Sequence, residues 1–259
     1  MGATVAVSPA AARRGCDRER DGYRPSGTRG QCHLAVPRRA VRGAREYPGQ
    51  VPLRLDLAEP RVDLGPLTTA LAGGACAVIP TDTVYGLVCD AAQPAACARL
   101  GELKRRDPLQ PSTVMFASVA AARARLLAPL DAALAARAEA LLERGATVLI
   151  PNPDGHYVHL CGEQPQRIGV RVSRFAPRLA SALEDVGAIV ATSANLHGGD
   201  DPRTLAEVPG ELAAGCAVLV DGGPAQAGRA STVLDLCAPR PVILREGALA
   251  TADALALIA

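Results

Sequence analysis

Aromatic side chains are scarce in this sequence. Its 259 residues include no Trp, 2 Phe and 4 Tyr. The hydrophobic core must therefore be built from Leu, Val, Ile and Ala. The scarcity also argues against a platform on which the bases of a single-stranded nucleic acid would stack, because such platforms need several aromatic side chains.

Paired cysteines are absent as well. The eight cysteines stand singly, and none belongs to a C-x-x-C pair. Cys76 and Cys89 lie in or near apolar runs, and we interpret them as small buried side chains. His156 and His159 are three residues apart, but no cluster of Cys or carboxylates accompanies them. We expect no zinc site, and a reducing, cytoplasmic location is the default expectation.

The sequence also lacks long hydrophobic runs. No apolar run approaches the roughly 20 residues that a membrane helix needs, so we expect no membrane contact. Residues 1–50 hold 10 Arg and 4 acidic residues without hydrophobic periodicity. We predict a disordered basic extension there. Residues 51–259 hold 18 basic and 22 acidic residues and contain no linker-like stretch, so we predict one folded domain.

Segments with the hydrophobic patterns of strands and helices intermix after residue 50. We expect strands at 75–79, 112–116, 147–150, 168–172, 188–192, 217–220, 231–236 and 241–245, and helices at 64–71, 94–103, 118–128, 131–144 and 177–184. A short helix is expected at the C-terminus. Because strands and helices do not alternate strictly, we predict an α/β fold of α+β character, with a twisted mixed sheet flanked by helices. The polar stretch 152–167 is longer than most connections, and we interpret it as a candidate lid.

Small polar residues follow three of the predicted strands. The runs are Thr81-Asp82-Thr83, Thr192-Ser193-Ala194-Asn195 and Asp221-Gly222-Gly223. Each run alone is compatible with ordinary turn chemistry. Together with nearby cations they are typical of one pocket at the ends of strands. The sequence contains no nucleophile elbow, Walker loop or dinucleotide fingerprint, so covalent catalysis is not indicated.

The single lysine of the chain is the most informative cation. Of the 28 basic residues 27 are Arg, and the one Lys is Lys104, two residues before Arg106. A compact ammonium beside a planar guanidinium suits a polyanion such as a nucleotide triphosphate. Pro108 disfavours helical geometry just before it, so we predict an extended segment in which Lys104 and Arg106 share a face. The alternative is that both are solvated charges at a helix end.

At this point the sequence resembles the YrdC-like threonylcarbamoyl-AMP synthases, over roughly residues 60–250. The matching residues are Pro80 to Leu87, Lys104-x-Arg106 with Pro111, Val170-Arg171-Val172, Thr192 to Asn195, Asp221 to Gly223, Ser231 to Asp235 and Arg245-x-Gly247. Two elements depart from the family pattern. The usual Pro-Gly-Pro-x-Thr is replaced by Arg144-Gly145-Ala146-Thr147, and Leu196-His197-Gly198 follows Asn195. The resemblance is to the short, single-domain form.

The resemblance implies a nucleotidyltransferase with a concave basic cavity. Its reaction joins L-threonine, bicarbonate and ATP, with Mg²⁺, into threonylcarbamoyl-AMP and pyrophosphate. Downstream proteins then transfer the threonylcarbamoyl group to adenosine 37 of tRNA, and direct contact with tRNA or double-stranded RNA is a further expectation. Lys104 and Arg106 would be the catalytic, phosphate-binding cations.

The resemblance also implies roles for the remaining polar residues. Thr147, Ser193 and Asn195 would complete the ATP site, and the threonine end would be lined by Thr81, Thr83, Tyr85 and Arg171. Two other interpretations stay open. The fold could be a non-catalytic module that binds structured RNA, or a paralogue that adenylates a different carbamate.

Overall fold

The computed structural model describes residues 51–196, 198–226 and 229–259. The predicted disordered extension at residues 1–50 lies outside them. Within the described residues, no helix is long and apolar enough to cross a membrane.

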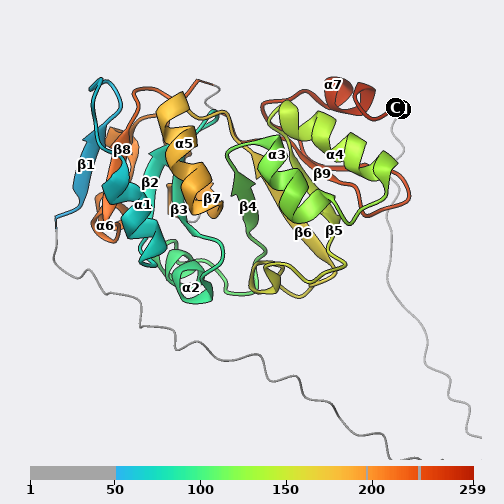
Figure 1. Ribbon diagram of the computed structural model, residues 1–259, viewed down its shortest axis with the longest axis horizontal. Coiled ribbons are helices and arrows are strands. Elements are labelled where there is room, and N and C mark those ends of the chain that lie inside the picture. The colour runs from blue at the N-terminus through green and yellow to red at the C-terminus, as the bar shows by residue number, and fades with distance from the viewer. Residues whose placement is uncertain (1–50, 197, 227–228) are drawn as a thin grey trace, which may run out of the picture. The chain divides into compact units, whose positions relative to one another are not determined.

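Ten strands form one mixed sheet in the order β1-β8-β2-β3-β7-β4-β6-β5-β9-β10 (Figure 1). They are β1 (Leu53–Asp56), β2 (Ala77–Pro80), β3 (Tyr85–Asp90), β4 (Thr113–Phe116), β5 (Thr147–Pro151), β6 (Arg167–Val172), β7 (Ala188–Ser193), β8 (Val218–Asp221), β9 (Val233–Asp235) and β10 (Val242–Arg245). Parallel pairs such as β4–β6 lie beside antiparallel pairs such as β4–β7. The mixed sheet flanked by helices is therefore confirmed.

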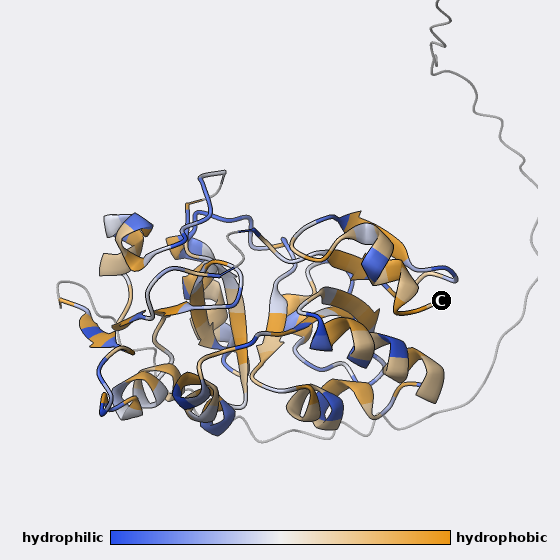
Figure 2. Cartoon of the chain, turned by 90° about the horizontal axis from the view of Figure 1, so that it is seen from above, coloured by the Kyte–Doolittle hydropathy of each residue, from blue (hydrophilic) through white to orange (hydrophobic). Residues whose placement is uncertain are grey.

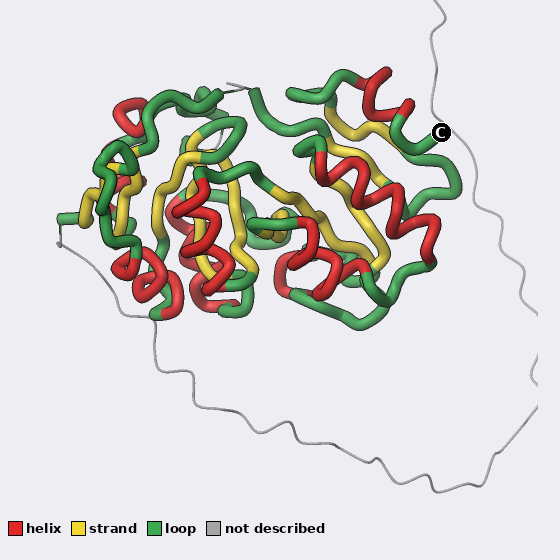
Figure 3. The backbone as a smooth tube through the Cα atoms, turned by 45° about the horizontal axis from the view of Figure 1, so that its top comes forward, coloured by secondary structure: helices red, strands yellow, loops and turns green. Residues whose placement is uncertain are grey.

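Helices surround this sheet (Figure 3). The α-helices are α1 (Gly65–Ala72), α2 (Pro94–Leu103), α3 (Val119–Ala122), α4 (Ala132–Glu143), α5 (Pro177–Val186), α6 (Gly210–Ala214) and α7 (Thr251–Ala256). Two short 3-10 helices are η2 (Val158–Leu160) and η3 (Leu205–Glu207), and a π-helical turn, η1 (Arg123–Leu127), continues α3. Ser118 and Asp131 cap α3 and α4 by accepting hydrogen bonds from backbone N–H groups.

Two hydrophobic clusters hold helices against opposite faces of the sheet. Ile189 and Met115 pack in the cluster that contains α1 and α5, whereas their strand neighbours Val190 and Val114 pack in the cluster that contains α2, α3 and α4. This alternation follows from the period of two residues along a strand. The strands are hydrophobic along much of their length, whereas many connecting loops are hydrophilic (Figure 2).

The face of β4, β6, β5 and β9 that is turned away from α3 and α4 carries the side chains of a cavity. Strand register places Met115, Arg171, Thr147 and Val233 side by side across these four strands. The neighbouring row contains the small residues Ala191, Thr113 and Gly169. The small side chains of this second row leave room for a ligand above the sheet. The first row contributes Arg171, a buried cation.

The sequence missed one change of chain direction that shapes the site. The sequence predicts the strand at 75–79 and polar residues after it, but it does not predict the strand at 85–90. Residues 81–84 form a turn, and the chain returns as β3, antiparallel to β2. The short edge strand β1 was also not predicted.

Candidate functional site

One large cavity, of about 1020 Å³, lies over the floor formed by β4, β6, β5 and β9. Its walls come from the turn after β2, the end of α2, the end of β7 and the loop that leads into β9. Five cations line it, Lys104, Arg106, Arg167, Arg171 and Arg245, against the three acids Asp107, Glu163 and Asp201. The described part of the chain is mildly acidic in composition, so this basic surface is local.

The turn after β2 is held by the hydroxyl of Thr81. Thr81 Oγ1 donates to the carbonyl of Val84 at 2.7 Å and accepts from the backbone N–H groups of Thr83 and Val84 at 3.2 and 3.3 Å. Thr83 Oγ1 lies 3.1 Å from Thr81 Oγ1. The first hydroxyl is thus occupied with the backbone, and Thr83 is the better placed of the two to offer a hydrogen bond to a ligand.

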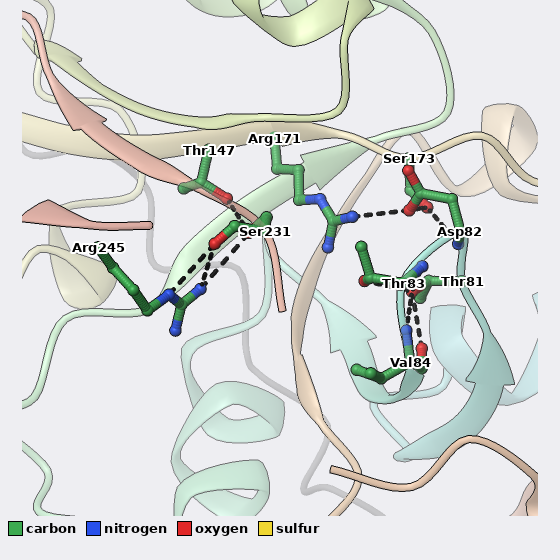
Figure 4. Close-up of polar contacts among 9 residues, drawn as sticks. All are labelled: Thr81, Asp82, Thr83, Val84, Thr147, Arg171, Ser173, Ser231 and Arg245. Carbon is green, nitrogen blue, oxygen red and sulfur yellow. Dashed lines mark hydrogen bonds and ion pairs between the residues drawn. The ribbon is translucent and has the colours of Figure 1, made fainter. Parts of the chain in front are cut away.

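The same turn carries Asp82, which binds Arg171 (Figure 4). Arg171 Nη2 lies 2.7 Å from Asp82 Oδ1, and the hydroxyl of Ser173 donates to the same oxygen at 2.7 Å. The Arg171 side chain is only 8% exposed. Burial lowers the pKa of Arg171, and the charge of Asp82 opposes that shift. Arg171 is therefore a buried cation that already has a carboxylate partner.

The C-terminal end of α2 turns Lys104 and Arg106 toward the cavity. Arg105 adopts φ 53°, the left-handed conformation usually reserved for Gly. The N–H of Arg105 binds the carbonyl of Glu102, and the N–H of Arg106 binds the carbonyl of Gly101. This is the Schellman pattern of helix termination. The predicted extended segment is therefore wrong, but Lys104 and Arg106 do lie on one side, because the left-handed residue between them reverses the chain.

Arg105 itself points away from the cavity. Its guanidinium forms an ion pair of 2.6 Å with Glu211, and its side chain is 70% exposed. An exposed pair of this kind adds little stability, roughly 0–1 kcal/mol. Arg105 is thus an internal control for its two neighbours.

Lys104 is buried among neutral oxygen atoms. Its Nζ donates to the carbonyl of Ser193 at 2.5 Å and to Asn195 Oδ1 at 2.8 Å. Ser193 Oγ donates to the same Asn195 oxygen at 2.7 Å. Burial, aided by the charge of Arg106, lowers the pKa of Lys104 to about 8, although Asp201 pulls it upward. In the described part of the chain no carboxylate pairs directly with this ammonium, so its charge is available to an anion.

Arg106 is held by a hydroxyl and a carbonyl on the loop before β4. Nη1 donates to Ser112 Oγ at 3.3 Å, and Nη2 donates to the carbonyl of Pro111. Burial lowers the pKa of Arg106. Neither partner carries a charge, so the loop positions the guanidinium without neutralising it.

On the far side of Arg171, three polar side chains meet at the loop into β9 (Figure 4). Thr147 Oγ1 lies 2.8 Å from Ser231 Oγ, and Arg245 donates to the Ser231 carbonyl at 2.9 Å. Thr147 also lines the cavity. A hydroxyl pair and another guanidinium thus extend the polar wall beyond Arg171.

Two buried nitrogen atoms of the cavity arginines have no hydrogen-bond partner among the described residues. They are Nε of Arg106 and Nε of Arg171. A buried N–H without a partner costs roughly 1–3 kcal/mol, and more when the group is charged. Each such group calls for an explanation, which can be an ordered water, an ion or a role in function.

Eight of the nine predicted site residues line this cavity. They are Thr81, Thr83, Lys104, Arg106, Thr147, Arg171, Ser193 and Asn195. Tyr85 is the exception. It is fully buried, and its hydroxyl donates to the carbonyl of Gly223 at 2.8 Å and accepts from the N–H of Gly222 at 3.0 Å. Strand alternation along β3 points it away from the cavity, so its assignment to the threonine end is corrected.

The run Asp221-Gly222-Gly223 is corrected in the same way. It follows β8, on the other side of β2, and these residues are not among those that line the cavity. They instead surround the hydroxyl of Tyr85. The three polar runs therefore do not form one pocket, since only the first two reach it.

Several residues of the site were not singled out from the sequence. Asp82 and Ser173 orient Arg171, and Ser231 and Arg245 belong to the polar wall beside Thr147. Asp82, Ser231 and Arg245 lie within the motifs that resemble the family, and that was the available signal. Ser173 offered none, because its role depends on a turn 91 residues away.

The predicted lid at residues 152–167 is anchored by its own polar residues. Asn152 Nδ2 donates to the carbonyls of His156 and Pro165, and its oxygen accepts from the N–H of His156. Leu160 is buried in the core. The segment contributes Glu163 and Gln164 to the cavity lining. It is thus an ordered wall in this structure.

Metal ligands do not gather at the cavity. No group of three or more His, Cys, Asp or Glu side chains that could hold a metal ion occurs among the described residues. The donor set of the cavity is dominated by cations and hydroxyls, which suit anionic and hydroxyl-bearing ligands.

Comparison with known proteins identifies relatives of this chain. Residues 69–247 match the model of the Sua5/YciO/YrdC family, which carries the description "Telomere recombination". A threonylcarbamoyl-AMP synthase of Alkalilimnicola ehrlichii is 34% identical over 191 residues, which cover 72% of this chain and 92% of that protein. The threonylcarbamoyl-AMP synthase of Bacillus subtilis is 32% identical over 175 residues, but they cover only 49% of its length.

Solved structures agree in fold. P. abyssi Sua5 complexed with L-threonine superposes with a TM-score of 0.68 at 26% identity, covering 81% of this chain and 61% of that chain. E. coli YciO gives a TM-score of 0.62 at 21% identity, covering 78% of this chain and 96% of that one. The chain spans about three fifths of the archaeal protein and nearly all of the bacterial one.

Proposed function

The chain belongs to the Sua5/YciO/YrdC family, and from this premise we propose that it is an L-threonylcarbamoyladenylate synthase. The reaction consumes L-threonine, bicarbonate and ATP and yields threonylcarbamoyl-AMP and pyrophosphate. The relative of similar length from Alkalilimnicola ehrlichii carries the name of this activity. The enzyme is thus a nucleotidyltransferase of the tRNA-modification class.

The observation that carries the proposal is the gathering of Lys104, Arg106 and Arg171 in the lining of one cavity, where no carboxylate among the described residues pairs directly with Lys104 or Arg106. Three cations whose desolvation lowers their pKa are costly to an empty protein. A ligand that carries several negative charges offsets that cost. A triphosphate is such a ligand, and Ser193 and Asn195 beside Lys104 offer hydroxyl and amide groups to its phosphates or ribose.

The chemistry requires positioning more than an activated protein nucleophile. The amine of threonine and bicarbonate combine to a carbamate with loss of water. A carbamate oxygen then bonds to the α-phosphorus of ATP, the bond from that phosphorus to its bridging oxygen breaks, and pyrophosphate leaves. Lys104 and Arg106 stabilise the charge that develops on the leaving phosphates, and the cavity keeps water from the labile product.

The threonine end of the cavity is proposed to lie at the turn after β2. Thr83 and Arg171 are close to each other there, with Thr81 and Asp82 holding the backbone and the guanidinium in place. Arg171 would pair with the carboxylate of threonine or of the carbamate. The complex of P. abyssi Sua5 with L-threonine supports a threonine site in this fold.

Magnesium is proposed to arrive with the nucleotide. The described residues offer no dedicated metal cluster, and Asp107, Glu163 and Asp201 are the carboxylates of the cavity lining that would help to hold the ion. When bound, Mg²⁺ supplies charge neutralisation to the triphosphate oxygens. We further propose a cytoplasmic location and a product that passes to tRNA-modifying transfer proteins, with tRNA or double-stranded RNA as a partner to be tested.

The test is release of pyrophosphate from ATP, measured with and without L-threonine and bicarbonate. Release that requires both substrates, together with a product of the mass of threonylcarbamoyl-AMP, is the expected result. Release with carbamoyl phosphate but not with threonine would instead identify a paralogue for another carbamate. Binding of structured RNA without any pyrophosphate release would identify a non-catalytic module.

A further inference from the structure

Two cysteines and a histidine meet outside the cavity. Cys89 on β3 and Cys97 on α2 approach each other to 3.8 Å between their sulfur atoms. His159, on the wall segment 152–167, places its Nε2 3.0 Å from the carbonyl oxygen of Ala91, and the Cys97 sulfur lies 4.0 Å from the same oxygen. None of the three lines the proposed substrate cavity. Their proximity therefore has no role in the proposed reaction.

The two thiols are not equivalent. Cys89 is fully buried and donates a hydrogen bond to the sulfur of Cys97, which is only partly buried. That bond, with help from the hydrogen bond and charge of His159, lowers the pKa of Cys97, while burial and Asp90 oppose the shift. The same bond and burial raise the pKa of Cys89. Because the thiolate is the reactive form, Cys97 is the attacking sulfur of the pair.

The other described cysteines lack this combination. Cys76, Cys161 and Cys216 are buried, and burial raises the pKa of each. Cys237 is exposed, yet partial burial of its sulfur and the nearby Asp235 raise its pKa to about 12. If exposure alone determined how fast a cysteine reacts with an oxidant, Cys237 would react first. If the fraction of thiolate determines it, Cys97 would react first.

We propose that Cys97 and Cys89 form an oxidant-sensitive dithiol, in which Cys97 reacts first with a peroxide or a small disulfide and Cys89 then closes an intramolecular disulfide. With oxidised glutathione, the Cys97 thiolate bonds to one sulfur and releases one glutathione thiolate. Cys89 then loses its proton, bonds to Cys97 and releases the second glutathione. The protein loses two electrons and two protons, and the glutathione disulfide is reduced to two thiols.

Closing this bond would alter the geometry beside the cavity. The sulfur atoms must approach from 3.8 Å to about 2.05 Å, and the part of this approach that rotation of the two side chains does not supply moves α2 against β3. Lys104 is the C-cap of α2, and Gly86 on β3 lines the cavity. The effect on activity rests on the proposed function. If the protein is the proposed synthase, oxidation lowers its turnover, because displacements of about 1 Å can cost on the order of a hundredfold in rate.

The experiment treats the full-length protein with oxidised glutathione and maps its cysteines by peptide mass spectrometry. We expect one dominant disulfide, Cys89–Cys97, reversed by dithiothreitol. Cys97→Ser should abolish it. Cys89→Ser, or Cys89→Ala if the hydroxyl disturbs the core, should instead trap a mixed disulfide between Cys97 and glutathione. Cys76→Ser is the matched control and should leave the Cys89–Cys97 disulfide unchanged.

The contribution of His159 is measured separately. His159→Gln should slow the alkylation of Cys97 by iodoacetamide several-fold at neutral pH without changing the melting temperature. Preferential reaction of Cys237, or a mixed disulfide on Cys97 that Cys89 never resolves, would overturn the proposal. Because the disulfide is read by mass, its formation is judged independently of any threonine-dependent activity. A disulfide that leaves turnover unchanged would reject only the predicted effect on Lys104.

Discussion

Lys104 and Arg171 are both buried cations on the cavity wall, but they are neutralised differently. Arg171 touches the carboxylate of Asp82 at 2.7 Å. The hydrogen-bond partners that Lys104 has within the described ranges are neutral, namely the carbonyl of Ser193 and the amide oxygen of Asn195. Arg171 is thus neutralised by a carboxylate of the protein, whereas the charge of Lys104 is available to a ligand.

The difference indicates a division of labour between the two ends of the cavity. The end near Arg171 is pre-organised by an ion pair, so a ligand there is recognised by geometry and by the remaining N–H groups. The end near Lys104 holds an ammonium whose pKa is lowered to about 8, and an anion that binds there raises it again. Electrostatic attraction of the triphosphate is therefore expected mainly at the Lys104 end.

The largest expected effect comes from breaking the paired end. Asp82→Asn keeps the shape of the side chain but leaves Arg171 buried without a counter-charge. Loss of one partner of a buried pair costs about 3–5 kcal/mol. We expect the free energy of unfolding, measured by urea denaturation, to fall by that order. A matched exposed pair is the control, since Glu211→Gln should cost less than about 1 kcal/mol. Equal effects of the two changes would show that the Asp82 pair contributes no more than a surface pair.

The next largest effect concerns the unpaired end. Lys104→Arg preserves the charge but replaces a compact ammonium with a larger planar group. Because misplacement of about 1 Å can cost on the order of a hundredfold, threonine-dependent pyrophosphate release should fall by about that factor while the protein folds normally. Arg105→Lys, next in the chain, should lose little. Full activity in Lys104→Arg would contradict the assignment of Lys104 to the phosphates.

The neutral oxygen atoms around Lys104 provide a gentler test. Asn195→Ala removes one partner of the ammonium and one group offered to the nucleotide. The KM for ATP should rise by roughly tenfold, the size of one hydrogen bond to a charged group. Unchanged kinetics together with a lower melting temperature would assign Asn195 to the turn after β7 alone.

The smallest effect is a dependence of nucleotide binding on pH. Below about pH 8 Lys104 carries its charge, and above that value it loses it. The Kd for ATP should therefore rise by up to about tenfold between pH 7 and about pH 9, as measured by calorimetry. In Lys104→Met this rise should disappear. A profile that is the same in both proteins would assign the titration to another group.

The sequence predicted which residues meet, but not always the reason. The rarity of lysine singled out Lys104, and its spacing from Arg106 placed both on one side. The backbone that achieves this was not foreseen, because a left-handed residue is normally signalled by Gly or Asn and here it is Arg105. The helix runs from Pro94 to Leu103 as expected, but it ends through the left-handed Arg105 and not at Pro108.

Long-range partners were beyond the reach of a sequence pattern. Asp82 contacts Arg171, 89 residues away, and nothing in the local sequence distinguishes it from an ordinary turn residue. Tyr85 was misplaced for a related reason. The resemblance implies that Tyr85 lies at the threonine end with Thr81 and Thr83, but the chain reverses at residues 81–84, and the reversal sets the face on which Tyr85 lies in β3.

The hydrogen bonds of Tyr85 have a consequence for how variants of this protein would be interpreted. Gly222 and Gly223 hold the Tyr85 hydroxyl, and a side chain at position 222 would come within 2.7 Å of Pro80, the residue that leads into the Thr81 turn. In a mutational scan scored by activity, position 222 would therefore rank with the substrate-binding positions although it touches no substrate. The positions that lower activity when mutated would therefore include residues that pack behind the cavity wall as well as residues that line the cavity.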